Sequence, residues 1–196
     1  MLAKARLALL VLLFTLSLNA KFLFNDHLVS PKAADFIEKI GNELYSKTNI
    51  SAYLIATNDK LKRGVSVYEY LKKYTSSMSE PYAAIVFIPN SQRIHLVASN
   101  NELLIGLDKD TILDYAIKVI ASKDSNSLQS KYDVGLVQAY SELADEIAAI
   151  KNVKLDNTIK EGGRVVLSIV NGIIIIGSVI IIWIFFIAPL LKRKKS

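Results

Sequence analysis

Five aspartates in this sequence lie where loops or helix starts are expected, and carboxylates in such places can bind a hard divalent cation. They are Asp26, Asp59, Asp108, Asp110 and Asp133. Calcium and magnesium prefer several oxygen ligands from different segments of a chain, many of them carboxylates. The competing interpretation is structural, because aspartate at a helix start usually caps the helix and loop carboxylates are usually solvated.

Asp26 and Asp133 are the two residues that we predict to be metal ligands, for calcium or magnesium. In a sheet covered by helices, the segments that carry them can meet at one end of the sheet. We expect Asp110 to cap a helix instead. The only two histidines, His27 and His95, exclude a multi-histidine metal site, and the absence of cysteine excludes zinc–thiolate chemistry.

No catalytic residue is predicted, because the familiar active-site motifs are absent from the sequence. The chain has no nucleophile elbow, P-loop, zinc-protease motif or EF-hand loop. Two classes of function stay open at this point. One is a non-catalytic accessory of a membrane protein complex. The other is a metal-assisted phosphatase, in which Asp26 and Asp133 hold the ion that polarises phosphoryl oxygens.

The run 165–191 contains no ionisable side chain and is followed by the basic residues 192–195. A helix needs about 20 apolar residues to cross a bilayer, so this run predicts a single C-terminal transmembrane helix. Basic residues beside a span stay on the cytoplasmic side. We therefore expect a cytoplasmic tail at 192–196 and an exported domain before the span.

Residues 1–20 have the pattern of a secretory signal peptide. Lys4 and Arg6 precede an apolar run that ends at Leu18, shortly before Lys21. Leu18 is bulkier than the small residue usual at that position, so an uncleaved anchor stays open as the alternative. Either interpretation places the middle of the chain outside the cytoplasm. We predict the periplasmic face of a bacterial inner membrane.

The formal net charge of +6 belongs to the ends of the chain. Residues 21–164 contain 18 basic and 18 acidic side chains, so the predicted exported part has no net charge. A domain that binds nucleic acid normally carries its basic excess within the folded part. The charge pattern therefore argues against a nucleic-acid partner and for membrane topology.

Apolar periodicity and turn residues divide the exported part into alternating elements. The predicted elements are a lead-in over 21–29, helices over 31–47, 66–74, 111–121 and 133–150, and strands over 51–57, 82–88 and 93–99, with a further short strand suggested at 103–107. In the third helix, Ile112, Tyr115, Ala116 and Val119 are expected to face the core. The order predicts one α/β domain over 21–150, with a mixed sheet between helices, and then a polar tether over 151–164.

Three stretches resemble the TPM domain family. Residues 25–30, Asn-Asp-His-Leu-Val-Ser, are similar to its Asn-Asp entry motif, and residues 82–99 are similar to its central hairpin. Residues 131–136, Lys-Tyr-Asp-Val-Gly-Leu, resemble the Asp-Tyr-containing stretch that opens its last helix. The family often has glycine after the hairpin, where this chain has Ser99 and Asn100.

The resemblance implies an exported, membrane-tethered α/β module that maintains or assembles a membrane protein complex. It also implies the alternative activity, because some members of the family bind calcium or magnesium and show weak acid-phosphatase activity. Since Asp133 opens the family-like stretch, the resemblance adds to its candidacy as a metal ligand.

Overall fold

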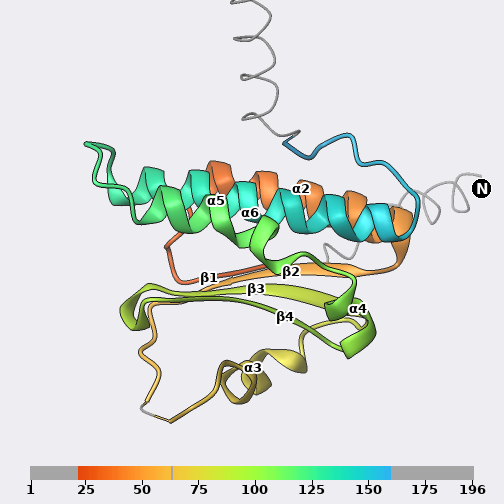
Figure 1. Cartoon of the computed structure of the whole chain (residues 1–196), viewed down its shortest axis with the longest axis horizontal. Coiled ribbons are helices and arrows are strands. Elements are labelled where there is room, and N and C mark those ends of the chain that lie inside the picture. The colour runs from red at the N-terminus through yellow and green to blue at the C-terminus, as the bar shows by residue number, and fades with distance from the viewer. Residues whose placement is uncertain (1–21, 63, 160–196) are drawn as a thin grey trace, which may run out of the picture. The chain divides into compact units, whose positions relative to one another are not determined.

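The computed structural model describes residues 22–62 and 64–159, which form an α/β domain around one four-stranded sheet (Figure 1). The strands are β1 (Leu23–Asn25), β2 (Ser51–Ala56), β3 (Tyr82–Ile88) and β4 (Arg93–Ala98). The helices are α2 (Pro31–Thr48), α3 (Val67–Thr75), α4 (Asn101–Ile105), α5 (Lys109–Ile120) and α6 (Leu128–Ile150), with a 3-10 turn, η1, at Pro89–Ser91.

The sheet has the strand order β1-β2-β3-β4 and is mixed. β1, β2 and β3 run parallel, and β4 pairs antiparallel with β3 through the tight η1 turn. Every residue of β2 and β3 is buried, as expected for central strands that are covered on both faces. The mixed sheet between helices that the sequence predicts is therefore confirmed for the described residues.

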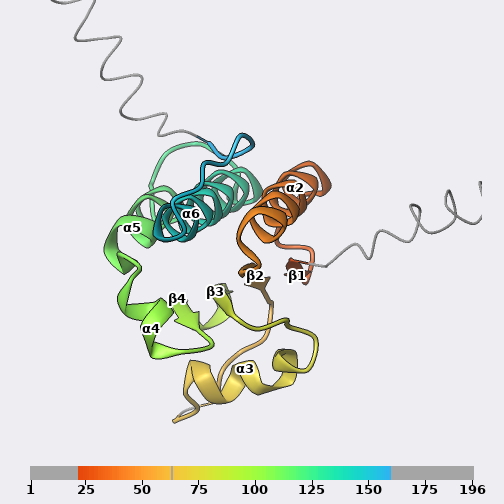
Figure 2. The same cartoon turned by 90° about the vertical axis from the view of Figure 1, so that its right-hand side faces the viewer.

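Helices cover the two faces unequally. Figure 2 shows α2, α5 and α6 together on one face of the sheet and α3 alone on the other. The larger core lies under α2 and α6, where Tyr140 is fully buried and its hydroxyl donates a hydrogen bond of 2.8 Å to the carbonyl oxygen of Ala52. This bond satisfies a hydroxyl that would be costly to bury without a partner.

α2 begins and ends where the sequence predicts. The Ser30 side chain accepts a hydrogen bond from the amide of Ala33, Pro31 occupies the first turn, and Asn49 ends the helix in the left-handed conformation at φ 56°. Within α2, Gly41 faces the ring of Phe22 at very close range. A glycine is needed there, because any side chain would occupy the space of that ring.

The structure differs from the sequence predictions in several elements. The lead-in contains β1, which is only three residues long, and the suggested strand at 103–107 is replaced by the short helix α4. Asp108, and not Asp110, caps α5, because its carboxylate accepts hydrogen bonds from the amides of Asp110 and Thr111. α6 begins five residues before the predicted start, where Ser127 provides the cap.

The chain after α6 returns along the domain instead of leaving it at residue 151. In this C-terminal strap (residues 151–158), Leu155 is buried, and the amides of Asp156 and Asn157 donate hydrogen bonds of 2.7 and 2.9 Å to the carboxylate of Glu43 in α2. The part of the predicted polar tether that the structure describes is thus largely fastened to the folded domain.

The predicted signal peptide or anchor (1–20), the rest of the tether (160–164), the predicted span (165–191) and the tail (192–196) lie outside the described residues. Within 22–62 and 64–159, none of the helices combines the length and apolar character needed to cross a membrane.

Candidate functional site

Asp26 follows β1 and is exposed at the carboxyl edge of the parallel strands. Its Oδ2 atom accepts a hydrogen bond of 2.6 Å from the hydroxyl of Thr57 and one of 3.1 Å from the amide of Asn58. Thr57 and Asn58 directly follow β2, the neighbouring parallel strand. The Asp26 carboxylate therefore joins the ends of two strands, which is a structural role whether or not it also binds an ion.

Thr57 extends this contact to α3. The hydroxyl of Tyr70 lies 3.1 Å from that of Thr57 and donates to the Asp59 carboxylate at 2.8 Å, and Lys73 forms an ion pair with Asp59. Hydrogen bonds from Lys73 and Tyr70 lower the pKa of Asp59. Asp26 and Asp59 thus belong to one network around Thr57, which holds the loop after β2 against α3.

Asp133 has a different set of partners. Its Oδ1 atom accepts hydrogen bonds from the amide of Ser30 at 2.9 Å and from the Gln129 side chain at 3.0 Å. Gln129 also donates to the carbonyl oxygen of Leu28, so this pair fastens the loop before α2 onto α6. A cavity of about 290 Å³ lies beside that loop, lined in part by His27 and Gln129.

Within the described part of the chain, the two predicted metal ligands therefore have no hydrogen-bonding partner in common. Asp26 is linked to the end of β2, and Asp133 to the start of α2. Among the described residues, no three histidine, aspartate or glutamate side chains are grouped so that they could hold a metal ion. Calcium or magnesium binding by Asp26 and Asp133 stays a prediction.

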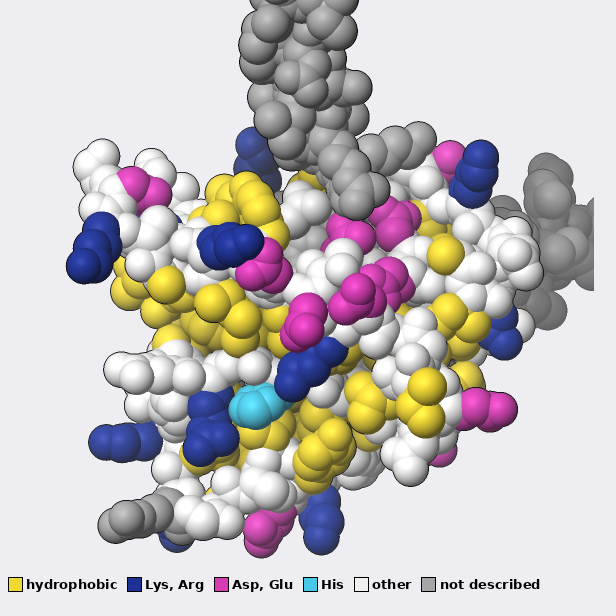
Figure 3. Space-filling view, viewed as in Figure 1, with side chains coloured by type: hydrophobic (Ala, Val, Ile, Leu, Met, Phe, Trp, Pro, Cys, Tyr) yellow, Lys and Arg dark blue, Asp and Glu magenta, His cyan; other side chains and the backbone are white. Residues whose placement is uncertain are grey.

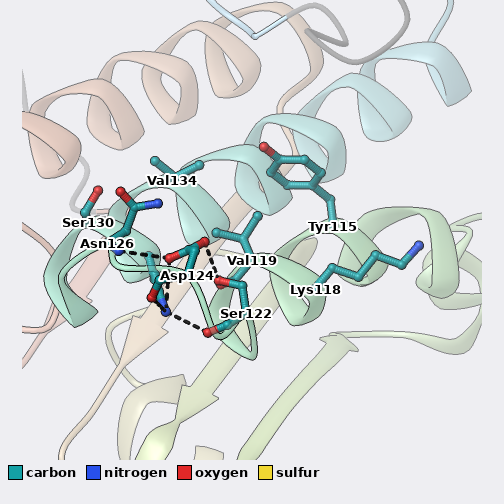
Figure 4. Close-up of a pocket in the computed structure, with 9 residues that line it drawn as sticks. Tyr115, Lys118, Val119, Ser122, Asp124, Asn126, Ser130 and Val134 are labelled. Carbon is teal, nitrogen blue, oxygen red and sulfur yellow. Dashed lines mark hydrogen bonds and ion pairs between the residues drawn. The ribbon is translucent and has the colours of Figure 1, made fainter.

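A pocket of about 320 Å³ lies between α5 and the start of α6 (Figure 4), and Lys131 is one of the residues that line it. The Lys131 ammonium group is nearly buried and contacts the carbonyl oxygens of Ser122 and Asp124 at 2.6 and 3.3 Å and the Asp124 carboxylate at 3.2 Å. These three contacts use the three N–H donors of a lysine. Lys131 therefore fixes the loop between the helices and has no donor left for an anionic ligand.

An exposed apolar cavity lies between α5, the start of α6 and the beginning of β4. This α5–β4 groove is a cavity of about 450 Å³ lined mainly by Phe87, Ile94, Ile117, Ile120, Leu128 and Tyr132. Leu128 is 59% exposed and Ile117 is 47% exposed. Figure 3 shows apolar side chains gathered between the helix layer and the sheet on this side of the domain, with both basic and acidic side chains beside them.

A second, more polar cavity of about 530 Å³ continues the groove along α5, and both cavities are lined by Ile94 and Ile117. His95, Lys109 and Asp110 lie in this second cavity. Burial and the neighbouring positive charges of Lys109 and Arg93 lower the pKa of His95. Asp110 and Asp114 line the same cavity, so it presents both basic and acidic side chains.

Sequence reasoning did not identify the α5–β4 groove. It placed Tyr115 on the inner face of α5, whereas Tyr115 is 48% exposed and Ile117 points into the groove. A usable signal was present, because α5 has apolar residues at 112, 113, 116, 117, 119 and 120. Such a face is wider than the single stripe that a helix needs to pack on a core.

Comparison with protein-family models and with curated proteins gives no relative from which a site could be transferred. No protein-family model matches the chain, and no curated protein matches it. The TPM resemblance therefore stays a prediction that depends on the motifs at 25–30, 82–99 and 131–136.

Proposed function

We propose that this chain is a membrane-anchored, exported, TPM-like domain that acts as a non-catalytic accessory or assembly factor for a membrane protein complex. The observation that carries the proposal is the α5–β4 groove, a concave apolar surface with large exposed side chains. Such surfaces on otherwise polar proteins are typical of interaction sites. The predicted span at 165–191 would keep the domain beside its partner.

The groove can supply useful binding energy. Covering an exposed leucine or isoleucine side chain is worth about 1–3 kcal/mol, so Leu128 and Ile117 are the expected energetic centre of an interface. Both residues stand on α-helices that pack against the sheet, so little conformational entropy is lost when a partner binds. A tethered domain needs only modest affinity, because its partner is always nearby.

Site-specific crosslinking in intact membranes tests the accessory role. We expect a photo-reactive amino acid at Leu128 in the full chain to form a defined adduct with a membrane protein, because this residue lies at the centre of the proposed interface. The matched control is Tyr68 in α3, on the other side of the sheet, which is 58% exposed. The substitution Ile117→Ser should remove the Leu128 adduct. Equal adducts from both positions, or none from Leu128, would contradict the proposal.

The second candidate is a weak divalent-metal-dependent acid phosphatase, for which Asp26 and Asp133 would hold the ion. It is favoured by the exposure of Asp26 at the carboxyl edge of parallel strands, the edge where α/β proteins commonly bind ligands. Phosphate release by the purified full chain, with calcium, magnesium or chelator, separates the two candidates.

For an accessory protein we expect no metal-dependent phosphate release, with Asp26→Ala and Asp133→Ala indistinguishable from the unchanged chain. Metal-dependent release that both substitutions abolish, in protein that still unfolds cooperatively, would establish the phosphatase instead.

A further inference from the structure

We propose that the α5–β4 groove binds a partner segment in which a carboxylate lies next to apolar side chains, with Arg93 as the receptor for the carboxylate. This inference rests on the proposed docking function and adds the chemistry of the partner. It comes from one property of the groove, which is that a single charged side chain stands among its apolar lining residues.

Arg93 is suited to that role by its position. It is the first residue of β4, it is exposed, and it lines the groove beside Ile94. Arg93 makes no ion pair with any of the described residues. A guanidinium group binds a carboxylate through two parallel hydrogen bonds, and the surrounding apolar side chains strengthen this contact by excluding water.

The two aspartates of the adjoining cavity, Asp110 and Asp114, do not line the α5–β4 groove. Asp114 forms an ion pair with Lys118, one turn further along α5. Among the residues that the structure describes, the apolar part of the groove therefore keeps one positive charge without an ion pair, and a partner carboxylate is its complement.

The remaining parts of this chain do not have the required chemistry. Residues 1–21 contain no acidic side chain, and residues 160–196 contain only Glu161, which stands between Lys160 and two glycines. A second copy that met this groove with its own groove would bring two Arg93 side chains together, which is unfavourable. An anionic lipid surface is normally recognised by clusters of about 4–8 basic residues, and the groove offers one.

Selection from a phage-displayed library of random peptides tests the inference. The bait is the full chain in nanodiscs of phosphatidylcholine, compared with Arg93→Glu and with Lys72→Glu, a matched charge reversal on the exposed surface of α3. We expect selected peptides to have Asp or Glu within two residues of Leu, Ile or Phe. Their retention should fall at least tenfold on Arg93→Glu and stay unchanged on Lys72→Glu. Selection on Arg93→Glu should favour Lys or Arg instead.

Other results would overturn the inference in distinguishable ways. If the selected peptides do not bind Leu128→Ser but bind Arg93→Glu normally, the groove is a docking site, and the proposed role of a partner carboxylate is wrong. A lipid surface would be the occupant if phosphatidylglycerol added to the nanodiscs displaces the peptides from the unchanged chain, and if this displacement requires Arg93. Peptides insensitive to both Leu128→Ser and Arg93→Glu would reject the groove as a docking site, and with it the proposed function.

Discussion

The substitution Gly41→Val is expected to lower the free energy of unfolding by about 3 kcal/mol. A Cβ atom at position 41 would lie 2.5 Å from two ring carbons of Phe22 and 2.6 Å from the hydroxyl oxygen of Tyr140. Neither group can move cheaply, because Phe22 and Tyr140 are fully buried and the Tyr140 hydroxyl is bonded to Ala52. The better helix propensity of valine recovers only a few tenths of a kcal/mol.

Urea unfolding of residues 21–159, followed by circular dichroism, measures this effect. The matched control is Gly106→Ala, for which the nearest atom to a new Cβ is the mobile Cδ1 atom of Ile150 at 3.1 Å. We expect the control to change the unfolding midpoint little. A Gly41→Val protein as stable as the unchanged chain would show that α2 does not lie this close to Phe22 and α6.

Acid is expected to weaken the domain through Glu43, which holds the C-terminal strap. Burial raises the pKa of this carboxyl, but hydrogen bonds from Lys47, Asp156 and Asn157 outweigh that effect and lower the pKa from 4.5 to about 2. Because the pKa is lower in the folded state, the stabilisation is complete above about pH 4.5 and is lost as the pH falls toward 2. Allowing for screening by solvent, we expect a loss of about 1–2 kcal/mol.

To isolate this contribution, the free energy of unfolding of residues 21–159 is measured between pH 6 and pH 2 for the unchanged domain and for Glu43→Gln. The variant has no carboxyl to protonate at position 43, so its stability should fall less steeply over that range and should be lower near neutral pH. Parallel pH profiles for the two proteins would mean that Glu43 does not hold the strap.

The sequence predicts the central elements well because their signals are local and strong. α2 has a serine cap, a proline in its first turn and a regular apolar stripe, and β2 and β3 are short apolar runs between turn residues. β1 was missed because three residues carry no usable periodicity, and its strand character comes from pairing with β2. The run at 103–107 is apolar enough for a strand, but the cap at Asn100 starts a helix.

The candidate site was harder to predict because it depends on which loops meet. Asp26 and Asp133 could be selected by residue type, yet their partners Thr57 and Ser30 are 31 and 103 positions away along the chain. The groove needed still more information. The wide apolar face of α5 indicates a second contact surface but does not say what that surface faces, and Leu128 lies outside the helix that the sequence predicts over 133–150. The exposure of Ile117 and Leu128 follows from how α5 and α6 lie over the end of β4, which no local pattern specifies.

If the predicted span at 165–191 crosses a membrane, the C-terminal strap also limits how far the domain can reach from it. Only six residues separate the end of the strap from Val165, the start of the predicted span, and six extended residues cover about 20 Å. The strap ends beside Asp145 of α6, because the Thr158 hydroxyl donates a hydrogen bond to the Asp145 carboxylate. Leu128, the first residue of α6, precedes Asp145 by a helix length of about 26 Å. If residues 165–191 span a membrane as predicted, a partner segment must therefore lie within about 46 Å of the bilayer to reach the groove.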